Sequence, residues 1–235
     1  MHAHLAIARQ RFAHDSYARH LGIELDDLTH DTIRMHMQLR DDMNNWFGRP
    51  HGGAIYAEDQ INIFLSTFTA NHSDLAGGAI YHVGDFVNAS AIINSTISGN
   101  TSPQGGGVFA TGDDLNIYNS AIVNNDTNGF YMYDAGGNGP FALYNTIVAD
   151  NVGAQCVKDG GVTFSADAHN IATDVSCDLA TQRTSVQLNL GPLALNGGTT
   201  ASHALGANSV AVDAGDDTVC QDVNTVNNID QRAVS

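Results

Sequence analysis

A pattern that recurs at intervals of about 25 to 29 residues constrains this chain more than any other feature. Gly-Gly-Ala-Ile-Tyr occurs at Gly52–Tyr56 and again at Gly77–Tyr81. Four further segments of similar sequence each hold one apolar anchor before a polar turn, and the anchors are 29, 25 and 25 residues apart. These anchors are Phe68, Ile97, Ile122 and Ile147. A repeat of this length indicates a solenoid, because one repeat cannot bury its apolar face without a neighbouring copy.

The composition of the repeats favours a parallel β-helix. Each repeat has short apolar runs suited to strands, and its paired glycines permit corner conformations that other residues avoid. An Asn or Asp ends each anchor segment, where stacked side chains can hydrogen-bond from coil to coil. We therefore predict a mainly β fold, with repeats over 52–155 and C-terminal coils and a cap over 156–235. The predicted ladder comprises Asn71, Asn100, Asn125 and Asp150.

Two sets of motifs resemble known β-helix families. Gly-Gly-Ala-Ile followed by Phe68–Asn71 is similar to the repeats of polymorphic outer-membrane proteins. The C-terminal part resembles choice-of-anchor-Q surface proteins, which are right-handed β-helices. Its matching motifs are His169–Ile171, Leu190–Leu193, Asn196–Gly198, His203–Leu205, Val212–Asp216 and Asp230–Arg232. The resemblance implies a right-handed parallel β-helix, a non-catalytic surface or adhesion-type function, a cell-surface or carbohydrate ligand, and an extracellular or cell-surface location.

Charge divides the chain at the first pentapeptide. Residues 1–51 carry six arginines and seven acidic residues, whereas residues 52–235 carry three basic residues against eighteen acidic ones. Such asymmetry suggests two modules. The strongly acidic part repels nucleic acid, so we expect no nucleic-acid partner.

The sequence pattern of the N-terminal segment predicts a short α+β unit. Residues 5–20 have helical apolar spacing, and Thr32–Arg40 alternates between apolar and polar side chains as a half-buried strand does. Tyr17–Glu24 and Met43–Gly53 resemble the start of a hotdog-fold acyl-CoA thioesterase of the phenylacetate pathway. The long strands that would complete a hotdog fold do not follow. The alternative function is therefore an incomplete, inactive thioesterase, and only a complete hotdog would imply a dimer or higher oligomer.

The thioesterase resemblance assigns roles to four residues. Asn45 and His51 would orient nucleophile and substrate, and the Gly53 amide would polarise the thioester carbonyl at the start of a helix. Asp59 would be the base or nucleophile, one residue before the family position. The secondary structure of residues 54–65 distinguishes the β-helix from the thioesterase interpretation, and their sequence pattern fits either a helix or a strand. We predict strand, with the chain a chimera joined at the shared pentapeptide.

Three cysteines lie in the acidic part. Cys156 and Cys177 would close a loop of about 20 residues and are the predicted disulfide. A disulfide points to an oxidising compartment, whereas the absence of a signal-like start and of an anchor predicts a cytoplasmic location for the chain as written. No apolar run is long enough for a membrane span.

Few residues suit catalysis in the repeats. A second alternative is a carbohydrate-active lyase or hydrolase, yet Lys158 is the only lysine. No cofactor is required by the predicted function. Calcium is a candidate ligand of Asp213, Asp216 and Asp217, because carboxylates and turn carbonyls suit a hard cation. Tyr131 and Tyr133 are candidates for sugar contact on an outer face.

Overall fold

The computed structural model describes residues 23–28, 33–37, 53–58, 60–84, 89–112, 115–134, 140–178 and 180–233. The chain divides into two compact units, Met1–Pro50 and His51–Ser235. In the first unit, β1 (Ile23–Leu28) and β2 (Ile33–Met37) form an antiparallel pair. Strand β2 lies within the predicted strand Thr32–Arg40. The predicted helix over residues 5–20 falls outside the described residues.

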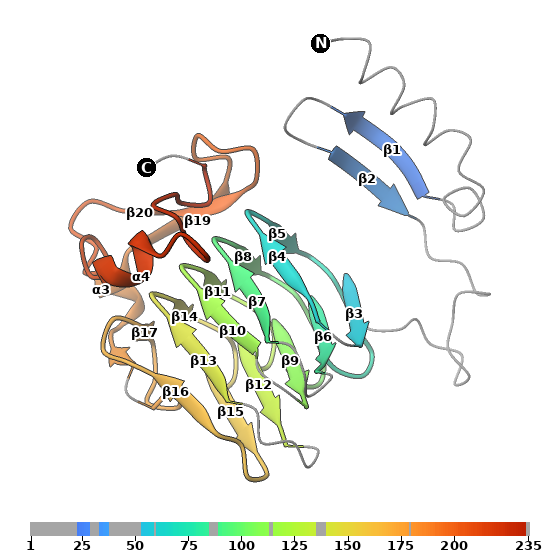
Figure 1. Ribbon diagram of the computed structural model, residues 1–235, viewed down its shortest axis with the longest axis horizontal. Coiled ribbons are helices and arrows are strands. Elements are labelled where there is room, and N and C mark those ends of the chain that lie inside the picture. The colour runs from blue at the N-terminus through green and yellow to red at the C-terminus, as the bar shows by residue number, and fades with distance from the viewer. Residues whose placement is uncertain are drawn as a thin grey trace. The chain divides into compact units, whose positions relative to one another are not determined.

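The second unit is a parallel β-solenoid built from successive sets of three short strands (Figure 1). Each of five sets gives one strand to each of three sheets, so each sheet takes every third strand from β3 to β17, and β18 then joins the third sheet. The first sheet contains β3 (Ile55–Glu58), β6 (Ile80–Val83), β9 (Val108–Thr111), β12 (Phe130–Tyr133) and β15 (Cys156–Asp159). The second contains β4 (Asn62–Phe64), β7 (Ser90–Ile93), β10 (Leu115–Tyr118), β13 (Phe141–Tyr144) and β16 (Phe164–Ala166). The third contains β5 (Thr67–Thr69), β8 (Thr96–Ser98), β11 (Ala121–Val123), β14 (Ile147–Ala149), β17 (Ile171–Ala172) and β18 (Thr181–Gln182). The predicted solenoid is therefore confirmed.

Apolar residues of equivalent positions stack inside the coils. Ile80, Ile92 and Ile97, one from each sheet, are fully buried in a single core cluster. Parallel pairing places Phe68 beside Ile97 and Ile97 beside Ile122, as the repeat predicts. The fourth anchor is Val148, which pairs with Ile122, and not the predicted Ile147. The fourth coil is one residue longer than the 25-residue spacing requires, so Ile147 faces outward instead.

The paired glycines are coil corners where backbones approach closely. A Cβ on Gly78 would lie 2.2 Å from the carbonyl oxygen of Gly106, and one on Gly53 would lie 1.6 Å from that of Gly78. Gly77 has a positive φ of 65°, which glycine adopts without strain. Gly53 and Gly78 therefore lie at equivalent corners of successive coils. Strands β3 and β4 confirm the prediction that residues 54–65 are extended.

An amide ladder runs inside one corner of the solenoid. The Nδ2 atom of Asn71 donates to Oδ1 of Asn100, Asn100 donates in the same way to Asn125, and Asn125 to Asn151. The ladder ends at Gln155, whose Oε1 accepts from Asn151 at 2.7 Å. The predicted fourth member, Asp150, is displaced by the extra residue of its coil. It takes the left-handed corner position instead, with φ 56°, as Asn124 does with φ 57° one coil earlier.

Cys156 and Cys177 form a disulfide that joins β15 to the loop after β17. Both cysteines are buried in the main core cluster. Cys220 is a free cysteine of intermediate exposure. The bridge closes the last coil covalently, at the end of the solenoid where fewer neighbouring strands pack on it.

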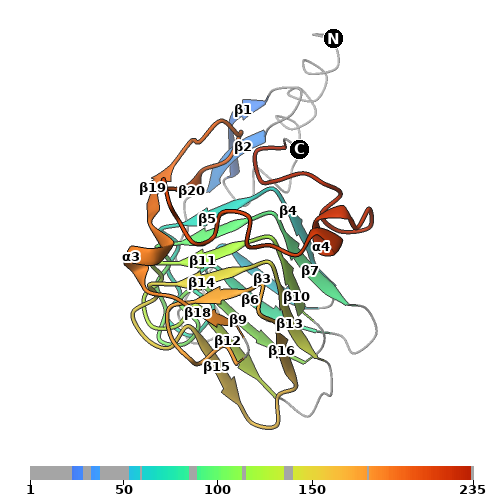
Figure 2. The same ribbon diagram turned by 90° about the vertical axis from the view of Figure 1, so that its left-hand side faces the viewer.

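After β18 the chain stops coiling and returns along the outer face of the third sheet (Figure 2). This C-terminal segment, residues 184–233, contains α3 (Ser185–Leu188), β19 (Leu190–Ala194), β20 (Ser202–Leu205) and α4 (Asp217–Gln221). Leu188 is fully buried against outward-facing Val123, Ala149 and Ile171. The coils thus extend beyond residue 156 to β18, and the rest of the chain covers a side of the solenoid. None of the helices in the described part of the chain is long and apolar enough to cross a membrane.

Candidate functional site

A cleft of about 700 Å³ lies between the outer face of the third sheet and the C-terminal segment. One wall comes from coil residues between Asn94 and Ile171, and the other from residues between Asn196 and Arg232. The side chains are small or polar for the most part. A second recess of about 700 Å³ lies beside α3 and β19, and His203 lines both. The returning segment therefore forms part of the wall of both hollows.

Asparagines at one corner of the coils hold the C-terminal segment. Asn94, Asn119 and Asn145 have φ of 50°, 44° and 49°, a left-handed conformation that Asn tolerates better than most residues. Nδ2 of Asn94 donates to the carbonyl oxygen of Ile229 at 3.0 Å. Asn145 binds the backbone of Asp216 through both amide atoms, at 2.7 and 3.1 Å. An Asn followed by Ser or Thr precedes each of these anchor strands, but this pair by itself does not indicate the contact with the C-terminal segment.

Two of these asparagines have a buried side-chain oxygen without a hydrogen-bond donor among the described residues. Asn94 and Asn119 line the cleft, and their buried Oδ1 atoms accept no hydrogen bond from the residues that the structure describes. The Asn94 side chain is almost completely buried, at 2% exposed. A buried carbonyl oxygen without a donor is costly.

His203 fastens the β19–β20 pair to the third sheet. Its Nδ1 is 2.7 Å from the carbonyl oxygen of Gly191, so Nδ1 must carry a proton. Its Nε2 is 2.9 Å from Oγ of Ser98 and, in the neutral ring, accepts the hydroxyl proton. Ser98 is buried in β8 beneath the histidine. The contact thus ties together segments that are 105 residues apart.

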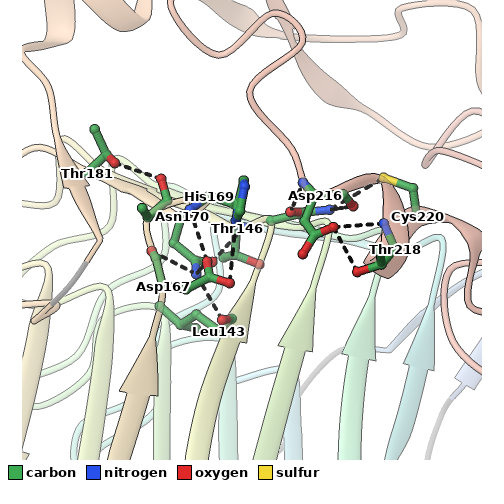
Figure 3. A network of polar contacts seen from close by, with 11 residues as sticks. Leu143, Thr146, Asp167, His169, Asn170, Thr181, Asp216, Thr218 and Cys220 are labelled. Atoms are coloured by element: carbon green, nitrogen blue, oxygen red, sulfur yellow. Dashed lines mark hydrogen bonds and ion pairs between the residues drawn. The ribbon is translucent and has the colours of Figure 1, made fainter.

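Three potential metal ligands meet beside the last coils (Figure 3). Asp167 and His169 belong to the connection between β16 and β17, and Asp216 is the N-cap of α4. One ligand atom from each lies within 4.8 Å of the others. Hydrogen bonds from the Thr218 hydroxyl and amide lower the pKa of Asp216, with a smaller contribution from His169. Asp216 is therefore ionised at neutral pH.

The predicted calcium ligands are not gathered at one point. Asp216 meets Asp167 and His169, and the described cluster includes neither Asp213 nor Asp217. Asp213 occupies a left-handed turn position, with φ 55°, and Asp217 lies in the first turn of α4. Calcium binding by the three aspartates therefore stays a prediction.

The predicted thioesterase residues lie mostly outside the described residues, namely Asn45, His51 and Asp59. Gly53 is described, and its N–H donates to the carbonyl oxygen of Gly77 at 3.1 Å. The residues after it form strand β3 instead of a helix. The Gly53 amide is thus already paired, and the helix end that would polarise a thioester carbonyl is not formed here.

Aromatic side chains stack along the outer face of the first sheet. Successive ring centroids of Tyr56, Tyr81, Phe109 and Tyr131 are 5.2, 4.8 and 5.3 Å apart, with nearly parallel planes. A hydrogen bond to Glu58 raises the pKa of Tyr56 to about 12. Phe109 covers one face of the Tyr131 ring, and the Tyr131 hydroxyl donates to Oδ2 of Asp159 at 2.8 Å. Tyr133, the other candidate for sugar contact, is 42% exposed on the same strand.

No protein-family model, curated protein or solved structure matches this chain. The resemblances to surface β-helix proteins and to thioesterases therefore rest on sequence motifs alone. What the fold and the cleft define is a parallel β-solenoid with a side-on C-terminal segment.

Proposed function

We propose that this chain is a non-catalytic binding module of the cell-surface or adhesion type, built on a right-handed β-helix. Its ligand is a hydroxyl-rich molecule, such as a carbohydrate chain, bound in the cleft between the third sheet and the C-terminal segment. The observation that carries the proposal is the cleft of about 700 Å³, whose two walls both carry hydroxyl and amide side chains. Hydroxyl groups of a ligand can donate to and accept from such side chains.

The size and lining of the cleft support this proposal. A volume of about 700 Å³ falls within the range of small-molecule sites. The wall adds the hydroxyls of Ser95, Thr96 and Ser120 and the amide of Asn196 to the corner asparagines. Such groups match a polar, uncharged ligand. The Asp216 carboxyl, near one end, has a lowered pKa and so is poorly suited to act as a general acid.

The disulfide supports an extracellular or cell-surface location. Disulfides such as Cys156–Cys177 persist in oxidising compartments and are rare in reducing ones. The sequence motifs similar to surface β-helix proteins point the same way. Location and ligand are parts of one proposal, since a surface module meets carbohydrate chains.

A panel of immobilised neutral glycans tests the proposal. We expect the full chain to bind at least one glycan and to release it uncleaved. Ala204 lines the cleft and is exposed, so Ala204→Trp should block binding while leaving the core intact. Val175 is 75% exposed and away from the cleft, so Val175→Trp is the matched control and should bind normally. Failure of the folded wild type to bind any glycan, or equal binding by both variants, would reject the proposed cleft.

A further inference from the structure

We propose that Asp167, His169 and Asp216 form a binding site for a divalent transition-metal ion such as Zn²⁺, which clamps the C-terminal segment to the last coils of the solenoid. The inference is independent of the carbohydrate proposal. It rests on an imidazole and two carboxylates that come from two separate parts of the chain, one in a coil and one in the returning segment.

The spacing of the three side chains suits one ion. Zinc binds nitrogen and oxygen at about 2.0–2.2 Å, which places ligand atoms about 3.3–3.6 Å apart around a tetrahedral ion. The three ligand atoms here lie within 4.8 Å of one another. Side-chain movements of about 1 Å would therefore bring them to the separation that zinc requires.

Each carboxylate is held by one oxygen and keeps the other available. Oδ1 of Asp167 accepts from the His169 amide at 3.0 Å and from Nδ2 of Asn170 at 2.9 Å. Oδ1 of Asp216 accepts from the amide and the hydroxyl of Thr218, both at 2.8 Å. Oδ2 of Asp167 faces Nδ1 of His169 at 3.5 Å. Partners of this kind orient metal ligands and limit the entropy lost on binding.

Both arms of the site are anchored to rigid coils. Asn170 is fully buried, accepts from the Thr146 amide at 2.9 Å and donates to the Leu143 carbonyl oxygen at 2.9 Å. Asn145, one coil earlier, fixes the backbone of Asp216. Figure 3 shows Asp167 and His169 on one side of the site and Asp216 on the other, each within this network. The arrangement is therefore set before any ion arrives.

Charge favours a cation at this place. Two carboxylates approach each other in a chain whose net charge is −16. A divalent ion bound between them offsets this repulsion. The imidazole also selects the kind of ion, because calcium and magnesium prefer oxygen ligands and zinc accepts nitrogen and oxygen together.

Calorimetric titration and thermal unfolding of the chelator-treated full chain test the site. We expect one equivalent of Zn²⁺ to bind and to raise the unfolding temperature, with Ca²⁺ at the same concentration giving a much smaller shift. His169→Ala and Asp216→Asn should each weaken zinc binding at least tenfold. With Co²⁺ as a probe, the visible absorption of the bound ion should change in His169→Ala.

Two variants serve as matched controls. His72 and Asp74 form an exposed pair at 3.0 Å, to which the described residues add no third ligand, so His72→Ala should leave zinc binding unchanged. Asp213→Asn removes a nearby aspartate that the cluster does not include. The proposal is overturned if the wild type takes up no zinc at micromolar concentrations, or if His169→Ala and Asp216→Asn bind as the wild type does. Glycan binding is also measured with the metal-free protein. This measurement tests the carbohydrate proposal separately from the zinc proposal.

Discussion

Truncation of Asn125 in the middle of the amide ladder should destabilise the solenoid more than truncation at the ladder's first member. The Asn125 side chain donates to the Ile97 carbonyl oxygen at 3.0 Å and to Oδ1 of Asn151 at 2.9 Å. It accepts from the amide and from Nδ2 of Asn100, at 3.0 and 2.9 Å. Asn125 and Asn100 are both fully buried. Asn125→Ala therefore removes four hydrogen bonds at a site that water does not reach.

The size of the stability loss depends on which hydrogen-bonding groups keep another partner after Asn125 is truncated. Nδ2 of Asn100 keeps its bond to the Phe68 carbonyl oxygen, and Oδ1 of Asn151 keeps the Asn125 amide. The Asn100 N–H loses its acceptor, and a stranded buried donor costs about 1–3 kcal/mol. With about 0.5–1.5 kcal/mol for each other lost bond, we expect a decrease of about 4 kcal/mol in the free energy of unfolding. That is a large share of the roughly 5–15 kcal/mol typical of a domain.

Asn71→Ala is the matched control. Its half-buried side chain donates one bond, to Asn100, within the described residues, so the expected loss is about 1 kcal/mol. Urea unfolding followed by circular dichroism measures both variants, with the midpoint shifting at constant slope. Equal losses for the two variants, or a loss below about 1 kcal/mol for Asn125→Ala, would refute the reasoning that the interior of the ladder carries the stability.

Three other predictions follow from the corner, the disulfide and the tyrosines. Gly78→Ala should prevent stable folding, because its Cβ would lie 2.2 Å from the Gly106 carbonyl oxygen. Soluble yield and circular dichroism would measure the loss of folding, and a normally folded variant would contradict the close approach. Reduction of Cys156–Cys177, or serine at both positions, should lower the free energy of unfolding by about 3 kcal/mol, because the bridge closes a loop over a separation of 21 residues. An unchanged melting temperature would argue against the bridge. The pKa of Tyr56 is raised to about 12 in the folded chain, so its contribution to stability is complete below about pH 10 and is lost as the pH rises toward 12. Tyrosinate absorption and urea midpoints between pH 9 and 12 would test this, and Tyr56 titrating normally near pH 10 in the folded chain would contradict it.

The sequence was a good guide where a pattern repeats and a poor one where coil length varies. Phe68, Ile97 and Ile122 stack as predicted, since parallel pairing requires equivalent residues to lie side by side. The fourth coil carries one extra residue, and a one-residue slip moves a side chain to the opposite face of a strand. For this reason Val148 and Asn151 take the places predicted for Ile147 and Asp150.

The candidate site was less accessible to sequence reasoning. Asp216 was identified from the sequence, but its neighbours Asp167 and His169 are about 50 residues away in the chain. Nothing in a linear pattern shows that residues 184–233 return along the solenoid. The left-handed asparagines Asn94 and Asn145 were visible as repeated Asn-Ser or Asn-Thr pairs, yet their role depends on what packs against them.

The sequence by itself determined the solenoid, its strand positions and its glycine corners, because each coil needs the same local conformations and the same buried residues as the next. Only the tertiary structure decided where the hollows and the metal-ligand cluster lie. These features depend on contacts between segments far apart in the chain, such as Asn94 with Ile229 and Ser98 with His203. Such contacts leave no period in the sequence, since each forms once and is set by the path of the returning chain.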